Sequence, residues 1–371
     1  MTRTLVVVHN NIDDASSIGA FAAWAVRAGL ERNWAVTAVC RDLAPELAAE
    51  VEHRPLYVPP RLHLLQWSVA RPTVRAALRG CRHDAMLVYQ PQLAAIADVW
   101  HVEYLSRAAR RARGPREPGR RGLLRDAQAA GVAALEDRYV RRIPAEIRLL
   151  FCSDGLRDQF TEIYGPASNS GVLYNPALGG RVGPGRSIPD ADLRARLTGG
   201  HDGYVVGFLG GGDTRKGADL VLAAVAADPE LFLIHAGPRP MDDSDRLLKG
   251  RTRGLGHLRD VTELLDAIDV LLVPSRFEPF GLVVAEAAAR GVPVLVDSRV
   301  GTAPLVLETG AGAVWTQPEP LGPAVARLTA NRPAIAAAGR ALTDRLDPSI
   351  LADQLFAELD AAFERRLRRS S

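Results

Sequence analysis

Short runs of β-branched and leucine residues recur along the chain, and many are followed by a turn and an alanine-rich segment. The first two runs are 4–9 and 34–40, and the alanine-rich segment 19–29 lies between them. Apolar runs of this length are typical of strands buried on both faces of a sheet, and helices between such strands favour parallel pairing. The opening of the chain is therefore predicted to be a βαβ unit.

The same alternation continues toward the C-terminus. We predict further strands at 85–90, 99–103, 148–153, 171–176, 204–209, 231–237, 254–257, 270–273 and 292–296, and helices at 126–142, 218–227, 282–290 and 348–367. The segment 179–189 is rich in glycine and proline and is predicted to link two domains. We place a first α/β domain at 1–178, a second at 179–345 and a C-terminal helical segment at 346–371.

Length and composition agree with a two-domain globular protein. The 371 residues exceed one ordinary core and fit two domains of about 150 to 200 residues each. Hydrophobic residues make up 47% of the chain and charged residues 24%, as in soluble proteins. No apolar run reaches the roughly 18 to 20 residues that cross a bilayer, and the N-terminus does not resemble a signal sequence. We therefore expect a cytoplasmic protein.

Cysteine and charge exclude some classes of site. Cys40, Cys81 and Cys152 lie far apart without C-x-x-C spacing, which argues against a disulfide framework and a zinc site. A formal net charge of +3 is too small to imply nucleic acid binding without a recognised module. Arginine supplies nearly all of the positive charge, because the only lysines are Lys216 and Lys249. Lys216 is therefore a candidate for a specific role.

Two glutamates flank the loop that follows the predicted strand 270–273. Glu278 lies in the loop, and Glu286 lies within the predicted helix 282–290. Ligands of open α/β sheets bind at the carboxyl ends of the strands, where helix N-termini present unpaired N–H groups. Phe280, Gly281 and Leu282 would supply such backbone donors, so an anion and a diol could be held side by side. The alternative is a loop that merely caps a helix, with the glutamates favoured by the helix dipole.

The spacing of Glu278 and Glu286 around Pro279-Phe280-Gly281 resembles the E-x7-E motif of the retaining glycosyltransferases of family 4. This resemblance implies the GT-B fold, which has two Rossmann-like domains with parallel sheets facing an interdomain cleft and a C-terminal helix crossing back to the first domain. It also implies that Glu286 accepts hydrogen bonds from the ribose hydroxyls of a nucleotide-sugar donor and that Glu278 lies near the donor sugar.

A second match is the glycine-rich turn after the predicted strand 204–209. A glycine cluster alone is a weak signal, and this one lacks the spacing of a P-loop. Lys216-Gly217, however, resembles the Lys-Gly that ends the phosphate loop of family 4 enzymes, which implies that Lys216 neutralises the donor diphosphate beside Gly210. Many relatives have an arginine where this chain has Gly211, and Arg215 is our candidate replacement. Leu255 lies where relatives hold the base through main-chain groups.

The N-terminal half matches the family in layout more than in residues. His101 ends a predicted strand where many relatives place an active-site histidine, and Glu103 is its polar neighbour. A lone histidine is as often a satisfied structural group. The first loop carries Asp13, Asp14 and Ser16 where relatives usually have a Gly-Gly pair. Two carboxylates would repel a diphosphate, so we assign these side chains to acceptor binding.

Residues 103–147 contain eleven arginines. One hypothesis is a solvated surface that uses arginine for solubility. The other is that part of the region 107–142 binds an anionic acceptor, such as a phosphorylated sugar, or makes peripheral contact with an acidic membrane surface.

Taken together, these features predict a hexosyltransferase that moves a sugar from a nucleotide diphosphate donor, with a UDP-sugar expected, to a hydroxyl of an unidentified small-molecule, glycan or lipid-linked acceptor. His101, Glu278 and Lys216 are the predicted catalytic residues. The acidic segment 242–245 is predicted to be a solvated turn and not a metal site, so we expect neither metal nor cofactor. Two alternatives stay open: a nucleotide-sugar epimerase of GT-B fold, and a catalytically silent sugar-nucleotide-binding subunit.

Overall fold

The computed structural model describes residues 2–14, 17–57, 63–112, 120–177, 188–242, 244–258, 260–316 and 319–370. These residues form two compact units. The first contains the described residues up to Arg111, those from Arg120 to Pro176 and those from Pro348 onward. The second contains Ala112 and the described residues from Ala177 to Asp347. The predicted domain boundary after residue 178 lies outside the described residues.

The first unit is built on a seven-stranded sheet in which every strand pair is parallel. Its strand order is β5-β3-β1-β6-β7-β8-β9, formed by β1 (Thr4–Val8), β3 (Ala35–Cys40), β5 (Glu52–Pro55), β6 (Ala85–Val88), β7 (Val99–Val102), β8 (Arg148–Phe151) and β9 (Ser170–Val172). A short parallel pair joins β2 (Asn11–Ile12) to β4 (Asp42–Leu43). The helices are α1 (Ser17–Glu31), the 3-10 turn η1 (Pro45–Leu47), α2 (His63–Ala77), α3 (Pro91–Ala94), α4 (Ser106–Arg111), α5 (Arg120–Val140) and α6 (Asp154–Tyr164).

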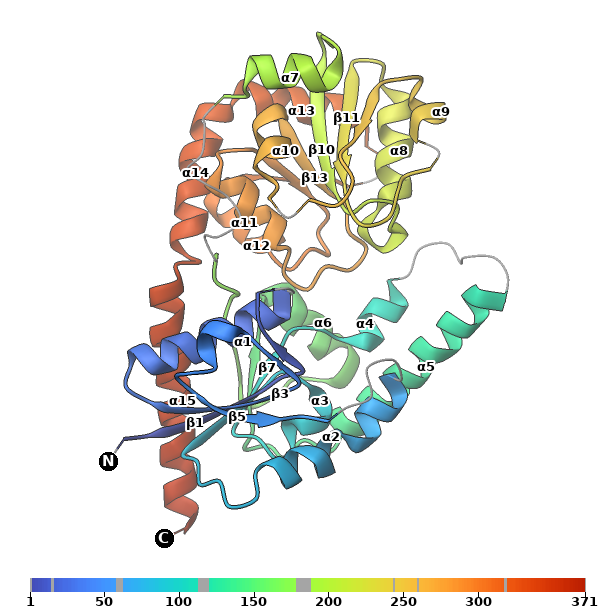
Figure 1. Ribbon diagram of the computed structural model, residues 1–371. Coiled ribbons are helices and arrows are strands. Elements are labelled where there is room, and N and C mark those ends of the chain that lie inside the picture. The colour runs from blue at the N-terminus through green and yellow to red at the C-terminus, as the bar shows by residue number, and fades with distance from the viewer. Residues whose placement is uncertain are drawn as a thin grey trace. The chain divides into compact units, whose positions relative to one another are not determined.

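The C-terminal helix α15 (Pro348–Ser370) completes this unit, as Figure 1 shows in red. It packs against α1, β6 and β7. Leu351, Leu355 and Leu359 recur every four residues and are buried, which places one stripe of the helix against the unit. Arg148 binds Glu358 of this helix at 2.6 Å. The helix is therefore held by both apolar and ionic contacts.

The second unit has a six-stranded parallel sheet. Its strand order is β12-β11-β10-β13-β14-β15, formed by β10 (Tyr204–Leu209), β11 (Leu231–Ala236), β12 (Thr252–Gly254), β13 (Val270–Val273), β14 (Val294–Val296) and β15 (Gly312–Val314). Its helices are α7 (Ala191–Thr198), the 3-10 turn η2 (Thr214–Lys216), α8 (Ala218–Ala227), α9 (Ser244–Leu248), α10 (Thr262–Ala267), α11 (Leu282–Ala289), α12 (Ala303–Thr309), α13 (Leu321–Ala330) and α14 (Arg332–Asp344).

Strand alternation divides the helices of this unit between two faces of the sheet. Val206 and Phe208 of β10 share one buried cluster with residues of α8, α9 and α13. Gly207 faces the other way, where a Cβ atom would come within 2.4 Å of Ile268 Cδ1 next to α10. The strand order reverses between β10 and β13, and in doubly wound sheets the crevice at such a reversal is where ligands bind.

Two local predictions are wrong. The acidic segment 242–245 is not a turn throughout, because α9 begins at Ser244, which is buried. The strand expected at 254–257 lies earlier, since β12 covers Thr252–Gly254 and pairs with β11. In both places the local sequence pattern does not predict the element. Contacts with the neighbouring strand or helix determine the structure there instead.

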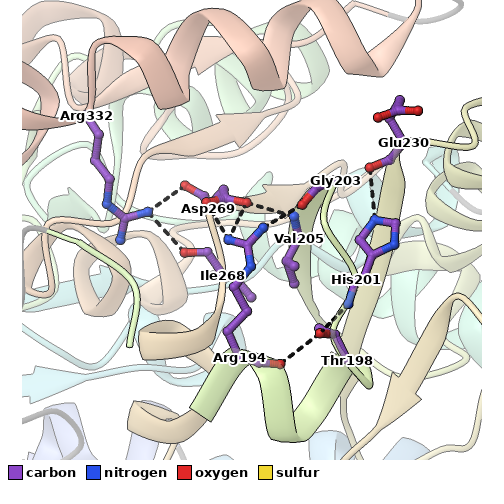
Figure 2. A network of polar contacts seen from close by, with 9 residues as sticks. All are labelled: Arg194, Thr198, His201, Gly203, Val205, Glu230, Ile268, Asp269 and Arg332. Carbon is purple, nitrogen blue, oxygen red and sulfur yellow. Dashed lines mark hydrogen bonds and ion pairs between the residues drawn. The ribbon is translucent and has the colours of Figure 1, made fainter. Parts of the chain in front are cut away.

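A buried ionic network closes the amino edge of the second sheet, as Figure 2 shows. Asp269, which precedes β13, accepts hydrogen bonds from Arg194 of α7 at 2.8 and 2.9 Å and from the N–H group of Val205 in β10 at 2.8 Å. Arg332 of α14 donates to the carbonyl oxygens of Ile268 and Asp269, both at 3.0 Å. Burial lowers the pKa of the Arg332 guanidinium. The Asp269 carboxylate thus ties β10 and β13 to α7, and the carbonyl oxygens of residues 268 and 269 add α14 through Arg332.

At the opposite edge, two main-chain segments approach each other closely. The N–H groups of Gly210 and Gly211 both donate to the Ala236 carbonyl, at 2.9 and 3.0 Å, and Gly212 donates to the Arg239 carbonyl at 3.0 Å. Gly211 has a φ of 54°, and a Cβ atom there would lie 2.2 Å from the Arg239 oxygen. Only glycine fits this position, because both its backbone conformation and its surroundings exclude a side chain.

We predict that Asp269→Asn destabilises the protein by about 3 kcal/mol, because the substitution leaves buried arginine charge without its counterion. Denaturant unfolding measures the change. Asp202→Asn is the matched control, since Asp202 is exposed and has no ion-pair partner among the described residues. Equal stability of the two variants would show that the network adds nothing.

We also predict that Gly211→Ala is more destabilising than Gly250→Ala. Both glycines have positive φ values, 54° and 82°, but a Cβ atom at Gly250 meets nothing within 4 Å. The control should therefore lose only the cost of the left-handed backbone, about 1 to 2 kcal/mol. The loss at Gly211 should exceed it, because the Arg239 carbonyl must also move. The same unfolding measurement compares them, and equal losses would contradict the close approach.

Candidate functional site

The loops after β10 and β13 meet at the carboxyl edge of the second sheet, at the point where the strand order reverses. Lys216, from the loop after β10, forms an ion pair with Glu278, from the loop after β13. Their side chains are 25% and 13% exposed, so the pair is mostly shielded from water but still reachable. The structure therefore brings together two of the three predicted catalytic side chains.

Main-chain contacts hold each partner of this pair in place. Asp213 caps the turn η2 by accepting from the Arg215 N–H group at 2.9 Å, which orients Lys216. The Glu278 carbonyl accepts from the Gly301 N–H group at 2.8 Å, and Glu278 forms a parallel bridge with Val300. The ion pair thus joins two loops that are already anchored to the sheet.

The other two cations of these loops have structural partners. Arg215, the predicted replacement for a phosphate-binding arginine, donates to the Phe277 carbonyl at 3.0 Å and lies 3.5 Å from Asp213. Arg276 makes two hydrogen bonds to Asp219 of α8, both at 2.7 Å. No role was predicted for Arg276, although its place two residues before Glu278 was a signal. Both arginines connect the loop after β13 to the loop and helix after β10.

The predicted phosphate contacts through the glycine-rich turn are not available in this arrangement. The N–H groups of Gly210 and Gly211 are both used in hydrogen bonds to the Ala236 carbonyl. The turn therefore positions Lys216 and does not itself offer these two donors. At Leu255, where main-chain groups were predicted to contact the base, the N–H group is also used within the protein. It donates to the His235 carbonyl at 2.9 Å.

Helix α11 begins at this edge directly after Gly281, which has a φ of 95°. The first turn of a helix leaves N–H groups without an intrahelical acceptor, so the turn that begins at Leu282 can attract an anion. Phe280, which precedes Gly281, is buried. Glu286 lies one turn further along α11 with 9% of its surface exposed. Its assignment to a ribose stays a prediction.

In the first unit, His101 is fully buried in β7 and stacks on the Phe21 ring with centroids 4.3 Å apart. Its Nε2 atom lies 3.0 Å from the Leu173 carbonyl oxygen. Because a carbonyl oxygen only accepts, this nitrogen carries the proton. A ligand could reach the ring only after a movement of Phe21 or its neighbours. The catalytic role of His101 stays a prediction.

Glu103 forms a buried polar group with His101 and Asn175. His101 Nδ1 and Glu103 Oε1 lie 3.0 Å apart, but they are not aligned as a hydrogen bond, and neither atom has another hydrogen-bond partner among the described residues. Glu103 Oε2 accepts from the Asn175 amide at 2.9 Å. Glu103 is only 6% exposed, so it is not presented to an acceptor in this arrangement.

The other predicted acceptor residues lie in the first loop. Asp14 is exposed and pairs with Arg27 at 3.0 Å. Asp13 is half-buried. Ser16 lies outside the described residues. Asp14 therefore has an internal counterion, and its proposed contact with an acceptor is untested.

Part of the arginine-rich region is engaged in the first unit. Arg107 pairs with Asp137 at 2.5 Å and Arg111 with Glu162 at 3.3 Å, which connects α4 to α5 and α6. Four exposed arginines have no ion-pair or side-chain hydrogen-bond partner among the described residues: Arg110, Arg138, Arg141 and Arg142. The structure describes the backbone of Arg120 and Arg121 but not their side chains.

The described residues show neither a metal centre nor a membrane-spanning helix. They contain no group of three or more histidine, cysteine, aspartate or glutamate side chains that could hold a metal ion. None of the helices described is both long enough and apolar enough to cross a membrane. Among the described residues the three cysteines form no disulfide, and burial raises the pKa of the Cys40 thiol to about 12.

Known proteins resemble the segment that carries this site. Residues 203–331 match the family model described as glycosyl transferases group 1. The chain is 36% identical to a glycogen synthase of Mycobacterium tuberculosis over 203 residues, which cover 50% of this chain and 45% of that protein. It is 32% identical to D-inositol 3-phosphate glycosyltransferase 1 of Catenulispora acidiphila over 223 residues, 54% of this chain and 50% of that protein. The chain thus spans about half the length of the curated relatives it matches.

Solved structures resemble the chain over nearly its whole length. WaaG, a glycosyltransferase involved in lipopolysaccharide biosynthesis, superimposes with a TM-score of 0.70 and 17% identity, covering 96% of this chain and 99% of that one. Anabaena HepE in complex with UDP-glucose superimposes with a TM-score of 0.64 and 16% identity, covering 96% and 99%. The chain therefore has the two Rossmann-like units of the GT-B fold, and its residues 203–331 match a group 1 glycosyltransferase domain.

Proposed function

We propose that this protein is a glycosyltransferase that moves a sugar from a nucleotide diphosphate donor to a hydroxyl group of an acceptor. The observation that carries the proposal is the Lys216–Glu278 ion pair at the reversal point of the second sheet. This pair lies within the 203–331 segment that matches the group 1 glycosyltransferase model. A UDP-sugar is the donor we favour, because HepE, which shares the fold, has been crystallised with UDP and with UDP-glucose.

The chemistry requires an anion to be stabilised as it leaves. When the anomeric C–O bond breaks, negative charge grows on the departing diphosphate, and fixed positive groups in a water-poor site lower the barrier. Lys216 and the first turn of α11 supply positive charge and N–H donors at the same edge. Glu286 is our proposed acceptor for the ribose hydroxyls.

Donor binding would reorganise the ion pair. Without a ligand, Lys216 is neutralised by Glu278. A diphosphate competes with the Glu278 carboxylate for the ammonium group, and the freed carboxylate can then accept hydrogen bonds from the donor sugar. One pair of side chains would thereby recognise both ends of the scissile bond.

We further propose that transfer retains the anomeric configuration and needs no metal. The acceptor hydroxyl would attack on the face from which the diphosphate departs, and the departing phosphate would take its proton. No side chain is assigned as a covalent nucleophile. Addition of EDTA should leave the rate of UDP release unchanged.

The two lysines of the chain allow a matched test of this function. Lys216→Gln should lower the rate of UDP release from UDP-glucose by about 10²- to 10³-fold, because one positive donor to the leaving group is lost. Lys249→Gln removes the same charge from an exposed position just after α9 and should leave the rate unchanged. UDP release is measured with a panel of hydroxyl acceptors.

Three results would contradict the proposal. Equal rates for the two lysine variants would remove Lys216 from the chemistry. Formation of a new nucleotide sugar without acceptor would identify an epimerase. The absence of any turnover by the wild-type protein, together with binding of UDP, would favour a silent binding subunit.

For the acceptor side we propose a peripheral contact with an anionic lipid surface through α5. Leu123 and Leu124 are 62% and 70% exposed on this helix, and exposed arginines lie on α4 and α5. Exposed leucines beside arginines suit the boundary between headgroups and acyl chains, where apolar burial and charge attraction add.

The double variant Leu123→Ser, Leu124→Ser should bind phosphatidylserine-containing vesicles at least about tenfold more weakly, since burial of a leucine contributes about 1.5 kcal/mol or more. Leu307→Ser is the control, because Leu307 is 58% exposed on α12 of the other unit. Co-sedimentation measures binding. Wild-type protein that does not sediment with these vesicles would overturn the proposal.

A further inference from the structure

The positive groups around the Lys216–Glu278 pair are already matched by acceptors in the protein. Lys216 faces Glu278, Arg215 faces the Phe277 carbonyl and Asp213, and Arg276 is held by Asp219. The three positive side chains are therefore balanced by the carboxylates of Glu278, Asp213 and Asp219. A donor diphosphate carries negative charge of its own, so its binding calls for a cation beyond these three.

Arg239 lies beside this group on the segment that follows β11. Its carbonyl oxygen accepts the Gly212 N–H group at 3.0 Å and would lie 2.2 Å from a Cβ atom at Gly211. On the other side of the same turn, Lys216 Cβ would lie 2.9 Å from a Cβ atom at Gly210. The main chain of Arg239 and the side chain of Lys216 therefore flank two consecutive glycines.

The Arg239 side chain differs from those of Arg215 and Arg276 in having no partner. It is exposed, and the residues described offer it neither an ion pair nor a hydrogen bond. Its backbone, in contrast, is fixed by the glycine-rich turn. The main chain of such an arginine is already fixed, and its guanidinium is available for hydrogen bonds. Binding of an oxyanion would therefore cost only the conformational entropy of one side chain.

We propose that Arg239 binds the diphosphate of the nucleotide donor together with Lys216. This inference rests on the proposed function and adds a residue to it. The planar guanidinium can donate two parallel hydrogen bonds to phosphate oxygens, whereas Lys216 acts as a point charge. Arg239 also supplies the extra cation that the turn itself cannot carry, since Gly211 has no room for a side chain.

Equilibrium binding of UDP, GDP and UMP, measured by calorimetry, tests the proposal. Arg239→Ala should lower the affinity for the better-bound diphosphate by roughly 10- to 100-fold, as expected when charge-assisted hydrogen bonds are lost. The affinity for UMP should fall less. Arg239→Lys, which keeps the charge but not the fork, should lie between wild type and Arg239→Ala. Arg340→Ala removes an exposed arginine from α14 and should bind as wild type does.

The possible failures can be told apart. If the wild-type protein binds neither UDP nor GDP, the proposed function and this inference both fall. If wild type binds a diphosphate and Arg239→Ala binds it as tightly as Arg340→Ala does, only the role of Arg239 falls. Equal losses for UDP and UMP would likewise exclude recognition of the diphosphate by Arg239. Thermal melting of each variant shows whether the fold is kept.

Discussion

The close approach of two main-chain segments, 210–212 and 237–240, is the constraint on which the carboxyl edge of the second unit depends. Consecutive glycines are needed there because Arg239 and Pro240 carbonyl oxygens occupy the space of side chains at Gly211 and Gly212. The N–H groups of these two glycines are already used in this contact, because they donate hydrogen bonds to the carbonyl oxygens of Ala236 and Arg239. The turn therefore fixes the position of Lys216. Its own N–H groups are not available to an anion, so the groups that could attract one are side chains.

The opposite edge of the same sheet is held by buried ion pairs and hydrogen bonds of charged side chains. Asp269 joins β10 and β13 to α7, and Arg332 adds α14 through two carbonyl oxygens. β10 and β13 are also the strands whose carboxyl ends carry Lys216 and Glu278. Because both strands are held at their amino ends, the two loops begin from a defined register. The buried network therefore contributes to the geometry of a site that it does not touch.

The fold could be predicted largely from the sequence, because strands buried on both faces need continuous apolar runs, as Val270–Val273 shows. The meeting of Lys216 and Glu278 at one edge followed from parallel topology. Other features depend on contacts between residues far apart in the chain. The pairing of Arg276 with Asp219, the burial of His101 beneath Phe21 and the helix that starts at Ser244 could not be predicted from local pattern. Arg239 gave no sequence signal, since its significance comes from the backbone it touches.

The two units place polar residues at equivalent edges but in different environments. In the first unit, His9 and Tyr89 follow β1 and β6, the strands between which the order reverses, and their rings lie 5.6 Å apart. Burial lowers the pKa of His9 and raises that of Tyr89, so both side chains favour their neutral forms. In the second unit, the corresponding edge carries partly exposed ionic groups. The reversal point of the first sheet therefore carries two buried neutral rings, whereas that of the second sheet carries an ion pair that is still partly exposed.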